Sequence, residues 1–183
     1  MQRTEGNGGR FQRWQARLAL LAGLCMPVIG LLDAAPAQAK VEFAGPIRWL
    51  DYQQGLKAAS GHKKNVLLFL HTDSCPKCTL QGESFKTNRD LQKLAKDLIM
   101  VEVNGGTAPM DVVNRYARFG NYYPRIVFLQ SDGTPMDSII SANPSFPYYF
   151  QPSRPEVLIE AMKKAIATHT ASGAKSPAHH AKG

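Results

Sequence analysis

Cysteine is scarce in this sequence of 183 residues, which has only three, at positions 25, 75 and 78. That number excludes a small fold stapled by several disulfides, and a chain of this length can bury a core without them. Uninterrupted apolar segments are also short, and none reaches the ~20 residues of an ordinary membrane-spanning helix. Hydrophobic residues make up 44% and charged residues 20%, which excludes a disordered or coiled-coil chain. One folded domain is therefore expected.

Acidic residues are fewer than basic ones, 14 against 22, which gives a formal net charge of +8. Part of this excess lies before residue 18, where four arginines stand against one glutamate. The remainder is spread along the chain without a dense basic block, and no motif of an RNA- or DNA-binding domain is present. The sequence therefore does not favour nucleic acid as a partner.

The first 39 residues have the three parts of a secretory signal peptide. Arginines open the segment, an uncharged apolar run follows over 18–32, and alanines occupy positions 37 and 39. We expect cleavage before Lys40, export to the bacterial periplasm, and no stable membrane anchor after cleavage. An uncleaved anchor is the alternative, but an apolar run of 15 residues interrupted by a proline and a glycine spans a bilayer poorly.

Hydrophobic periodicity divides the rest of the chain into alternating helices and strands. The continuous apolar run at 66–70 is typical of a strand buried on both faces, and apolar residues recur at helical spacing in the segments around it. The pattern predicts helices over 51–60, 75–85, 91–98, 112–119 and 153–166, the first ended by Gly61, and strands over 66–70, 99–103, 125–130 and 136–140. The last two strands are joined by a hairpin turn at 131–133.

This order predicts an α/β domain over residues 40–167, with a mixed central sheet of about four strands and helices on both faces. Such an order of helices and strands is the thioredoxin arrangement. Residues 168–183 are small and polar and are expected to form a disordered tail.

The two cysteines left after cleavage, Cys75 and Cys78, stand three positions apart between an apolar strand and a helix. Unpaired N–H groups and the positive dipole end at a helix N-terminus stabilise a thiolate, which is the reactive form of cysteine. We therefore assign Cys75, nearer the helix start, as the nucleophile and Cys78 as the cysteine that resolves the mixed disulfide. Pro76 and Lys77, which lie between them, are assigned to tuning the pair.

Other chemistry for this pair is less favoured. A zinc site needs about four ligands, and the chain has no second pair of closely spaced cysteines and no histidines at a recognisable ligand spacing. Covalent haem attachment needs a histidine after the second cysteine, where this chain has Thr79. A purely structural disulfide would close so short a loop that it would restrain the unfolded chain little. We expect no metal, and no cofactor other than a redox-active disulfide between Cys75 and Cys78.

Tyr123 and Pro124 stand directly before the strand expected at 125–130. In a thioredoxin arrangement a cis proline at this place faces the cysteine pair, and the backbone before it can pair with an extended substrate segment. We assign both residues to substrate binding. The alternative is a trans proline in an ordinary loop, which base rates alone would favour.

Several motifs between residues 43 and 167 carry a resemblance to a known family. They are Trp49, Gly55-Leu56, Cys75-Pro76-Lys77-Cys78, Tyr122-Tyr123-Pro124-Arg125-Ile126-Val127-Phe128, Asp132-Gly133, Tyr148-Tyr149-Phe150 and Met162-Lys163-Lys164-Ala165. In these motifs the chain resembles small secreted thioredoxin-domain proteins, namely the anterior gradient family and its redox-active relative, thioredoxin domain-containing protein 12. The resemblance implies a thioredoxin fold and thiol–disulfide chemistry on secreted proteins, with Cys75 and Cys78 as the redox pair and Pro124 as the cis proline. Many thioredoxins bury a carboxylate six residues before the nucleophile; this chain has Phe69 there, so the usual proton acceptor for Cys78 is missing.

The sequence thus predicts a thiol–disulfide oxidoreductase that acts on thiols of secreted or periplasmic proteins and is reset by a separate redox partner. The net direction of electron flow stays open. A second hypothesis is a client-binding module of the same fold, in which the cysteines only anchor partners. His71 and Asp73, just before the pair, either move protons for it or only provide polar surface at the strand end. The aromatic residues at 146–150 either face the substrate or pack over the core.

Overall fold

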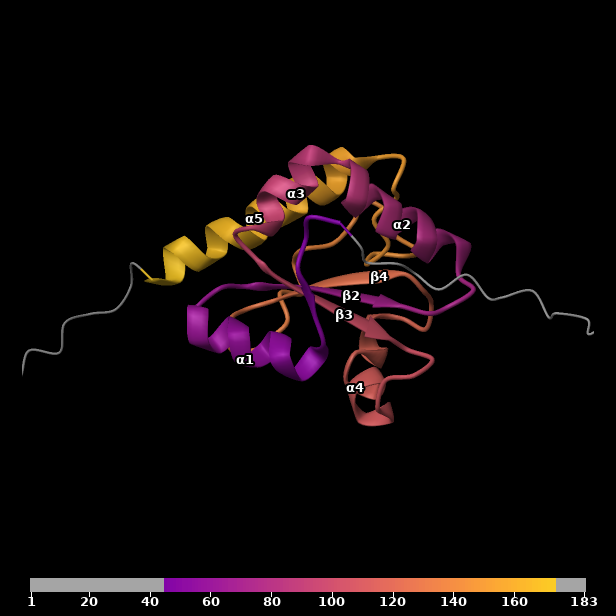
Figure 1. Cartoon of the computed structure of the whole chain (residues 1–183), viewed down its shortest axis with the longest axis horizontal. Coiled ribbons are helices and arrows are strands. Elements are labelled where there is room, and N and C mark those ends of the chain that lie inside the picture. Colours follow the sequence, from indigo (N-terminus) through magenta and orange to yellow (C-terminus); the bar gives the residue numbers. More distant parts are fainter. Residues whose placement is uncertain (1–44, 174–183) are drawn as a thin grey trace, which may run out of the picture. The chain divides into compact units, whose positions relative to one another are not determined.

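The computed structural model describes residues 45–173, with side chains through residue 168 (Figure 1). The elements in this segment are β1 (Trp49–Leu50), α1 (Tyr52–His62), β2 (Val66–His71), α2 (Pro76–Thr87), α3 (Arg89–Ala95), β3 (Ile99–Asn104), α4 (Met110–Arg115), the 3-10 helix η1 (Ala117–Phe119), β4 (Arg125–Leu129) and α5 (Pro155–Gly173). The predicted signal peptide at 1–39 lies outside the described residues. Among the described helices, none combines the length and the apolar character that crossing a membrane requires.

The strands form one sheet in the order β1-β3-β2-β4. β1, β3 and β2 are parallel to one another, and the last residue of β2, His71, pairs with Asn104 at the end of β3. β4 is antiparallel to β2, and its first residue, Arg125, pairs with Leu70. The end of β2, the end of β3 and the start of β4 therefore meet at one edge of the sheet, and the chain passes from this edge into the cysteine motif.

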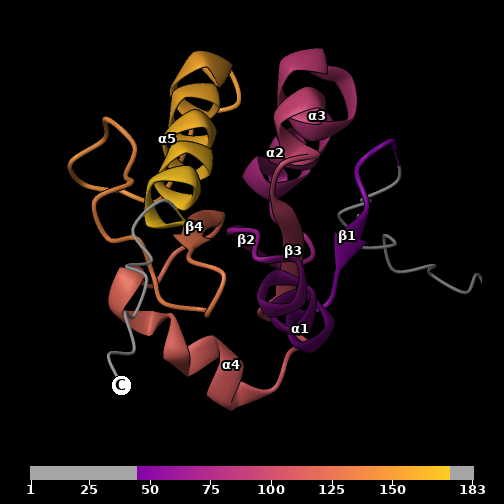
Figure 2. The same ribbon diagram turned by 90° about the vertical axis from the view of Figure 1, so that its left-hand side faces the viewer.

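Helices cover both faces of the sheet, with α1 and α4 on one face and α2, α3 and α5 on the other (Figures 1 and 2). Every residue of β2 is buried, because its side chains alternate between two apolar clusters. Val66, Leu68 and Leu70 pack with α1 and α4, whereas Leu67 and Phe69 pack with α2, α3 and α5. Burial on both faces explains the continuous apolar run. The predicted mixed four-stranded sheet of the thioredoxin fold is confirmed.

One member of the sheet differs from the prediction. The returning strand expected at 136–140 is not formed: after the turn, the N–H of Met136 still donates to the oxygen of Phe128 at 2.8 Å, and the pairing ends there. Met136 and Ile139 are both buried while Ile140 is 49% exposed. That three-residue spacing suits a turn and not the two-residue alternation of a strand. The fourth strand is β1, in a segment for which the sequence predicted no strand.

Two helix ends also differ from the prediction. α1 continues through Gly61 and ends at His62. Its C-cap, Lys63, has a left-handed φ of 54° and donates its N–H to the oxygen of Ala59. Gly61 does not stop the helix, because it keeps a right-handed helical conformation there. α5 continues to Gly173, so the domain boundary predicted at residue 167 falls inside this helix. Residues 174–183 of the predicted tail lie outside the described residues.

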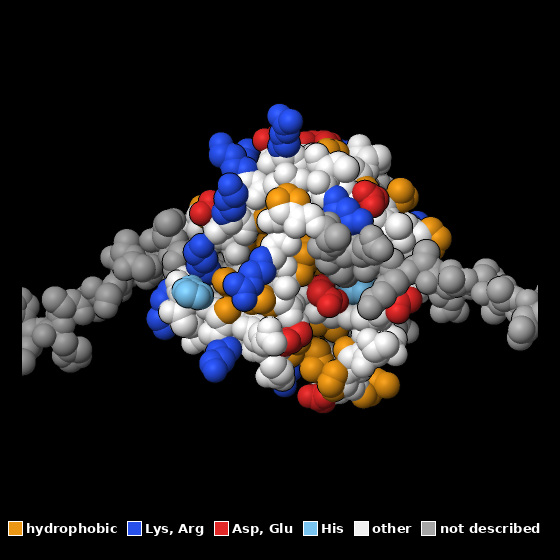
Figure 3. Space-filling view, viewed as in Figure 1, with side chains coloured by type: hydrophobic (Ala, Val, Ile, Leu, Met, Phe, Trp, Pro, Cys, Tyr) orange, Lys and Arg blue, Asp and Glu red, His pale blue; other side chains and the backbone are white. Residues whose placement is uncertain are grey.

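Charged side chains are unevenly spread over the face drawn in Figure 3. Most of the Lys and Arg side chains visible on it lie in the left half, toward the amino ends of the parallel strands, while several carboxylates lie nearer the centre and right. On this face, the excess of positive charge is therefore not gathered at the end of the sheet that leads to the cysteines.

Candidate active site

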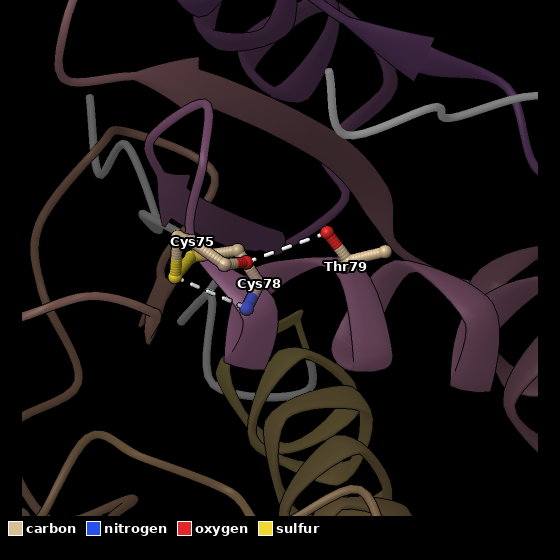
Figure 4. Close-up of a disulfide and its surroundings, with 3 residues drawn as sticks. All are labelled: Cys75, Cys78 and Thr79. Carbon is tan, nitrogen blue, oxygen red and sulfur yellow. Dashed lines mark hydrogen bonds between the residues drawn. A yellow bond between two sulfur atoms is a disulfide. The ribbon is translucent and has the colours of Figure 1, made fainter. Parts of the chain in front are cut away.

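The cysteine pair forms the start of α2 (Figure 4). Cys75 is the N-cap of the helix, and its sulfur accepts a hydrogen bond from the N–H of Cys78 at 3.1 Å. Pro76 follows in the first helical turn, where its fixed φ suits a helix and its missing N–H leaves no intrahelical bond unmade. The two sulfurs are joined as a disulfide, with the two Cα atoms 5.2 Å apart. The local sequence thus places the sulfur of Cys75 at the N-terminus of α2, within hydrogen-bond distance of the N–H of Cys78.

The two cysteines differ sharply in burial. Cys78 is fully buried, at 0% exposure, and belongs to the apolar cluster under α2. Cys75 is only partly buried and packs against the edge of the same cluster. The expectation that Cys75 is the more exposed cysteine is confirmed. Its assignment as nucleophile, and that of Cys78 as resolving cysteine, remain predictions about reactivity.

The predicted proline stands at the same edge of the sheet. The Tyr123–Pro124 peptide bond is cis, as the thioredoxin arrangement led us to expect. Because Arg125 pairs with Leu70, Pro124 lies level with the last residue of β2, four positions before Cys75. The fold therefore brings the Tyr123–Pro124 segment and the cysteine loop together, although they are far apart in the sequence. Their role in substrate binding stays a prediction.

Arg125 fixes the loop that precedes this proline. Its Nη1 donates to the carbonyl oxygens of Tyr116 and Gly120, and its guanidinium lies 5.1 Å from the centre of the Tyr123 ring. Burial lowers the pKa of Arg125, because the charged form loses hydration. The sequence analysis gave Arg125 no such role, since the two carbonyls it binds are brought to it by the packing of α4 and η1.

The aromatic segment at 146–150 lies beside the cysteine helix. The ammonium of Lys77 is 5.4 Å from the centre of the Tyr149 ring, and Tyr122 contacts Phe146 edge to face at 5.0 Å. Phe150 is buried in the core at 1% exposure, whereas Phe146 is 44% exposed. Packing over the core is thus confirmed for Phe150, whereas a substrate-facing role for the exposed end of the segment stays a prediction.

Polar groups lie directly beneath the cysteine loop. His71 is buried, and its Nε2 lies 2.8 Å from Oε2 of Glu102 on the neighbouring strand. Asp73 accepts a hydrogen bond from Nδ2 of Asn104 at 3.0 Å. The sequence analysis noted His71 and Asp73 but missed Glu102 and Asn104. A signal for Glu102 was present, because it is a single charged residue inside an otherwise apolar strand.

Comparisons with known proteins agree with this geometry. Residues 48–131 match the family model described as thioredoxin-like. The chain is 25% identical over 122 residues to anterior gradient protein 2-B of Xenopus laevis, covering 66% of this chain and 71% of that one. It is also 25% identical over 115 residues to human anterior gradient protein 2 homolog, an alignment that spans 63% of each chain.

Among solved structures, a thioredoxin from Thermus thermophilus superimposes with a TM-score of 0.55 at 18% identity, covering 75% of this chain and 98% of that one. At this identity the likeness concerns the fold. The mixed sheet, the cysteine pair opening α2 and the family-model match together define a thioredoxin-like domain. Within that class, the chain is similar to the anterior gradient proteins, as the sequence motifs indicated.

Proposed function

We propose that this protein is a thiol–disulfide oxidoreductase that acts on the cysteines of exported proteins. The observation that carries the proposal is the Cys75–Cys78 disulfide at the start of α2, with one partly accessible and one buried cysteine. A sulfur at this place is stabilised as a thiolate by backbone N–H groups and the helix dipole, which is what thiol–disulfide exchange requires of the attacking cysteine.

The reaction follows from the two positions. In the reducing direction, the thiolate of Cys75 attacks a substrate disulfide, and one substrate sulfur leaves as a thiolate that takes up a proton. Cys78 then loses its proton and attacks the sulfur of Cys75, which releases the second substrate thiol and closes the Cys75–Cys78 disulfide. Two electrons pass from the pair to the substrate, and a separate redox partner returns them. The oxidising direction is the reverse.

The segment before β4 would hold the substrate. Tyr123 and Pro124 lie level with the end of β2, so an extended polypeptide could pair with their backbone while its cysteine meets Cys75. The signal-like composition of residues 1–39 supports export to the periplasm, an oxidising compartment in which proteins form disulfides.

The test uses the variant Cys78→Ser with Cys75→Ser as its matched control. Each variant and the wild type are reduced, freed of reductant and mixed with a disulfide-containing polypeptide, such as insulin, and the products are separated without reductant. Turnover is followed in a parallel reaction in which dithiothreitol supplies the electrons. We expect turnover only in the wild type, trapped mixed disulfides in Cys78→Ser, and neither in Cys75→Ser. Client capture that survives in both variants, together with no turnover in the wild type, would support the client-binding module instead.

A further inference from the structure

The buried Cys78 thiol needs a proton acceptor, and the cysteine motif itself contains none. Cys78 must become a thiolate to attack the mixed disulfide, yet it is fully buried in an apolar cluster. Burial in apolar surroundings disfavours the charged form of a thiol. Phe69, six residues before Cys75, belongs to the same cluster and offers no proton acceptor. A base must therefore come from another part of the site.

Two titratable side chains flank Phe69 on the sheet. His71 lies two residues further along β2, and its ring stacks on that of Phe69 with 5.5 Å between centroids. Glu102 is the residue of β3 that pairs with Phe69 across the parallel ladder. His71 Nε2 and Glu102 Oε2 are 2.8 Å apart, with the two side chains 3% and 34% exposed. A carboxylate and an imidazole thus stand immediately beside the apolar residue.

These two side chains face the cysteine side of the sheet. Side chains alternate along a strand, and the alternate residues Leu68 and Leu70 belong to the cluster under α1 and α4. Phe69 packs instead in the cluster that contains Cys78. His71 is also the last residue of β2, so it lies at the end of the sheet from which the chain runs into the motif. The pair and Cys78 therefore share one face and one end of the sheet.

Other charged groups at this end are engaged elsewhere. Arg125 on β4 donates to carbonyl oxygens of Tyr116 and Gly120 and so is turned to the α4 side. Lys77 on α2 lies over the ring of Tyr149. Further titratable groups at this end are Asp73, bound by Asn104, Asp51, which lines a shallow pocket together with Glu102, the two cysteines themselves and Tyr123. Among these, the His71–Glu102 pair alone joins a buried imidazole to a carboxylate that reaches solvent.

We propose that the His71–Glu102 pair accepts the proton of the Cys78 thiol when Cys78 attacks the mixed disulfide. Glu102 orients and polarises the imidazole, and the imidazole takes the proton as the Cys78–Cys75 bond forms and the substrate sulfur leaves. The partial exposure of Glu102 then gives the proton a path to water. Glu102 on β3 thus supplies the carboxylate that is absent at the position of Phe69 on β2. This inference rests on the proposed oxidoreductase function.

The experiment resolves the two sulfur steps with 5,5′-dithiobis(2-nitrobenzoate). Reduced full-length protein releases one thionitrobenzoate when Cys75 attacks the reagent and a second when Cys78 resolves the mixed disulfide. The variant is Glu102→Gln, and the matched control is Glu160→Gln, which removes an exposed carboxylate on α5 that pairs with Lys163. Both phases are followed by stopped flow from pH 5 to 9, and Glu102→Asp tests rescue by the shorter carboxylate.

We expect Glu102→Gln to slow the second phase at pH 7 by about tenfold or more, while the first phase changes much less. Loss of a whole general base costs roughly 10²–10⁴-fold, and here the imidazole of His71 is kept. Glu102→Asp should recover part of the rate, and Glu160→Gln should match the wild type. If Glu102 acts only through its negative charge, its removal eases ionisation of Cys78, and the second phase becomes equal or faster. That opposite sign would overturn the inference. Loss of the first phase in the wild type would instead refute the oxidoreductase function itself.

Discussion

The difference in acidity between the two cysteines is the prediction that bears most directly on their roles. Single-cysteine variants, Cys78→Ser and Cys75→Ser, isolate each thiol in turn. The sulfur of Cys75 lies at the helix N-terminus, 3.1 Å from the N–H of Cys78, a donor that the Cys78→Ser variant keeps. A helix dipole contributes up to about 1 kcal/mol to an anion there. A hydrogen bond to a charged acceptor contributes about 1.5 kcal/mol or more.

Part of this gain is offset by the partial burial of Cys75, so we take about 2 kcal/mol as the net stabilisation of its thiolate. At about 1.36 kcal/mol per tenfold change, this corresponds to roughly thirty times more thiolate than an ordinary cysteine has at a pH where both are mostly protonated. Cys78 is 0% exposed, so water does not stabilise its thiolate.

The assay is alkylation by iodoacetamide as a function of pH, with thiolate absorbance at 240 nm measured in parallel. We expect the thiol of Cys78→Ser to ionise at lower pH than that of Cys75→Ser and to react at least about thirtyfold faster at pH 6. Alkylation of each variant after unfolding in guanidinium is the control and should give equal rates. A Cys78 thiol that ionises at lower pH than Cys75 would reverse the assigned roles.

Three further predictions concern the motif and the core. The reduction potential of the pair should lie above the ~−270 mV of thioredoxin, because the helix end and Lys77 stabilise the reduced thiolate. Lys77→Glu should lower this reduction potential, measured by equilibrating the protein with glutathione buffers, and the decrease should be smaller at high salt. An unchanged potential would contradict the charge argument. Burial raises the pKa of Tyr116, whose hydroxyl lies 3.0 Å from that of Tyr52. The unfolding free energy should therefore fall as the pH rises above about 10, and Tyr116→Phe should flatten this fall in urea titrations; an unaltered slope would refute the link. Phe85→Ala should lower the free energy of unfolding by about 3–5 kcal/mol, because Phe85 is 2% exposed and contacts Trp49 edge to face. Phe146→Ala should lower it far less, because Phe146 is 44% exposed, and equal losses would refute the burial argument.

Much of the site was readable from the sequence because its determinants are local. A strand buried on both faces shows as an unbroken apolar run, and the cysteine motif after it opens a helix. Proline in the first turn and a short loop before it place the sulfur of Cys75 at the helix N-terminus without help from the rest of the chain. The fold class and the position of Cys75 and Cys78 followed from these patterns, whereas the cis bond before Pro124 was expected only from the fold that they predict.

Other features depended on contacts between segments far apart in the chain. The segment from Met136 to Ile140 has the composition of a strand, but Met136 and Ile139 are both buried in the core. Two buried residues three positions apart do not fit the two-residue alternation of a strand. β1 has two residues, too few for a periodic signal, and it forms because β3 offers it a partner.

The sequence by itself determined that a closely spaced cysteine pair stands at a helix N-terminus, because capping and the helix dipole act within a few residues. Only the tertiary structure decided what surrounds that pair. The parallel register of β2 and β3 sets Glu102 beside Phe69 and within 2.8 Å of His71, and the packing of the 146–150 segment sets Tyr149 beside Lys77. Neither pairing leaves a trace in local spacing, since each joins side chains from separate elements that meet only when the sheet and the helices covering it have assembled.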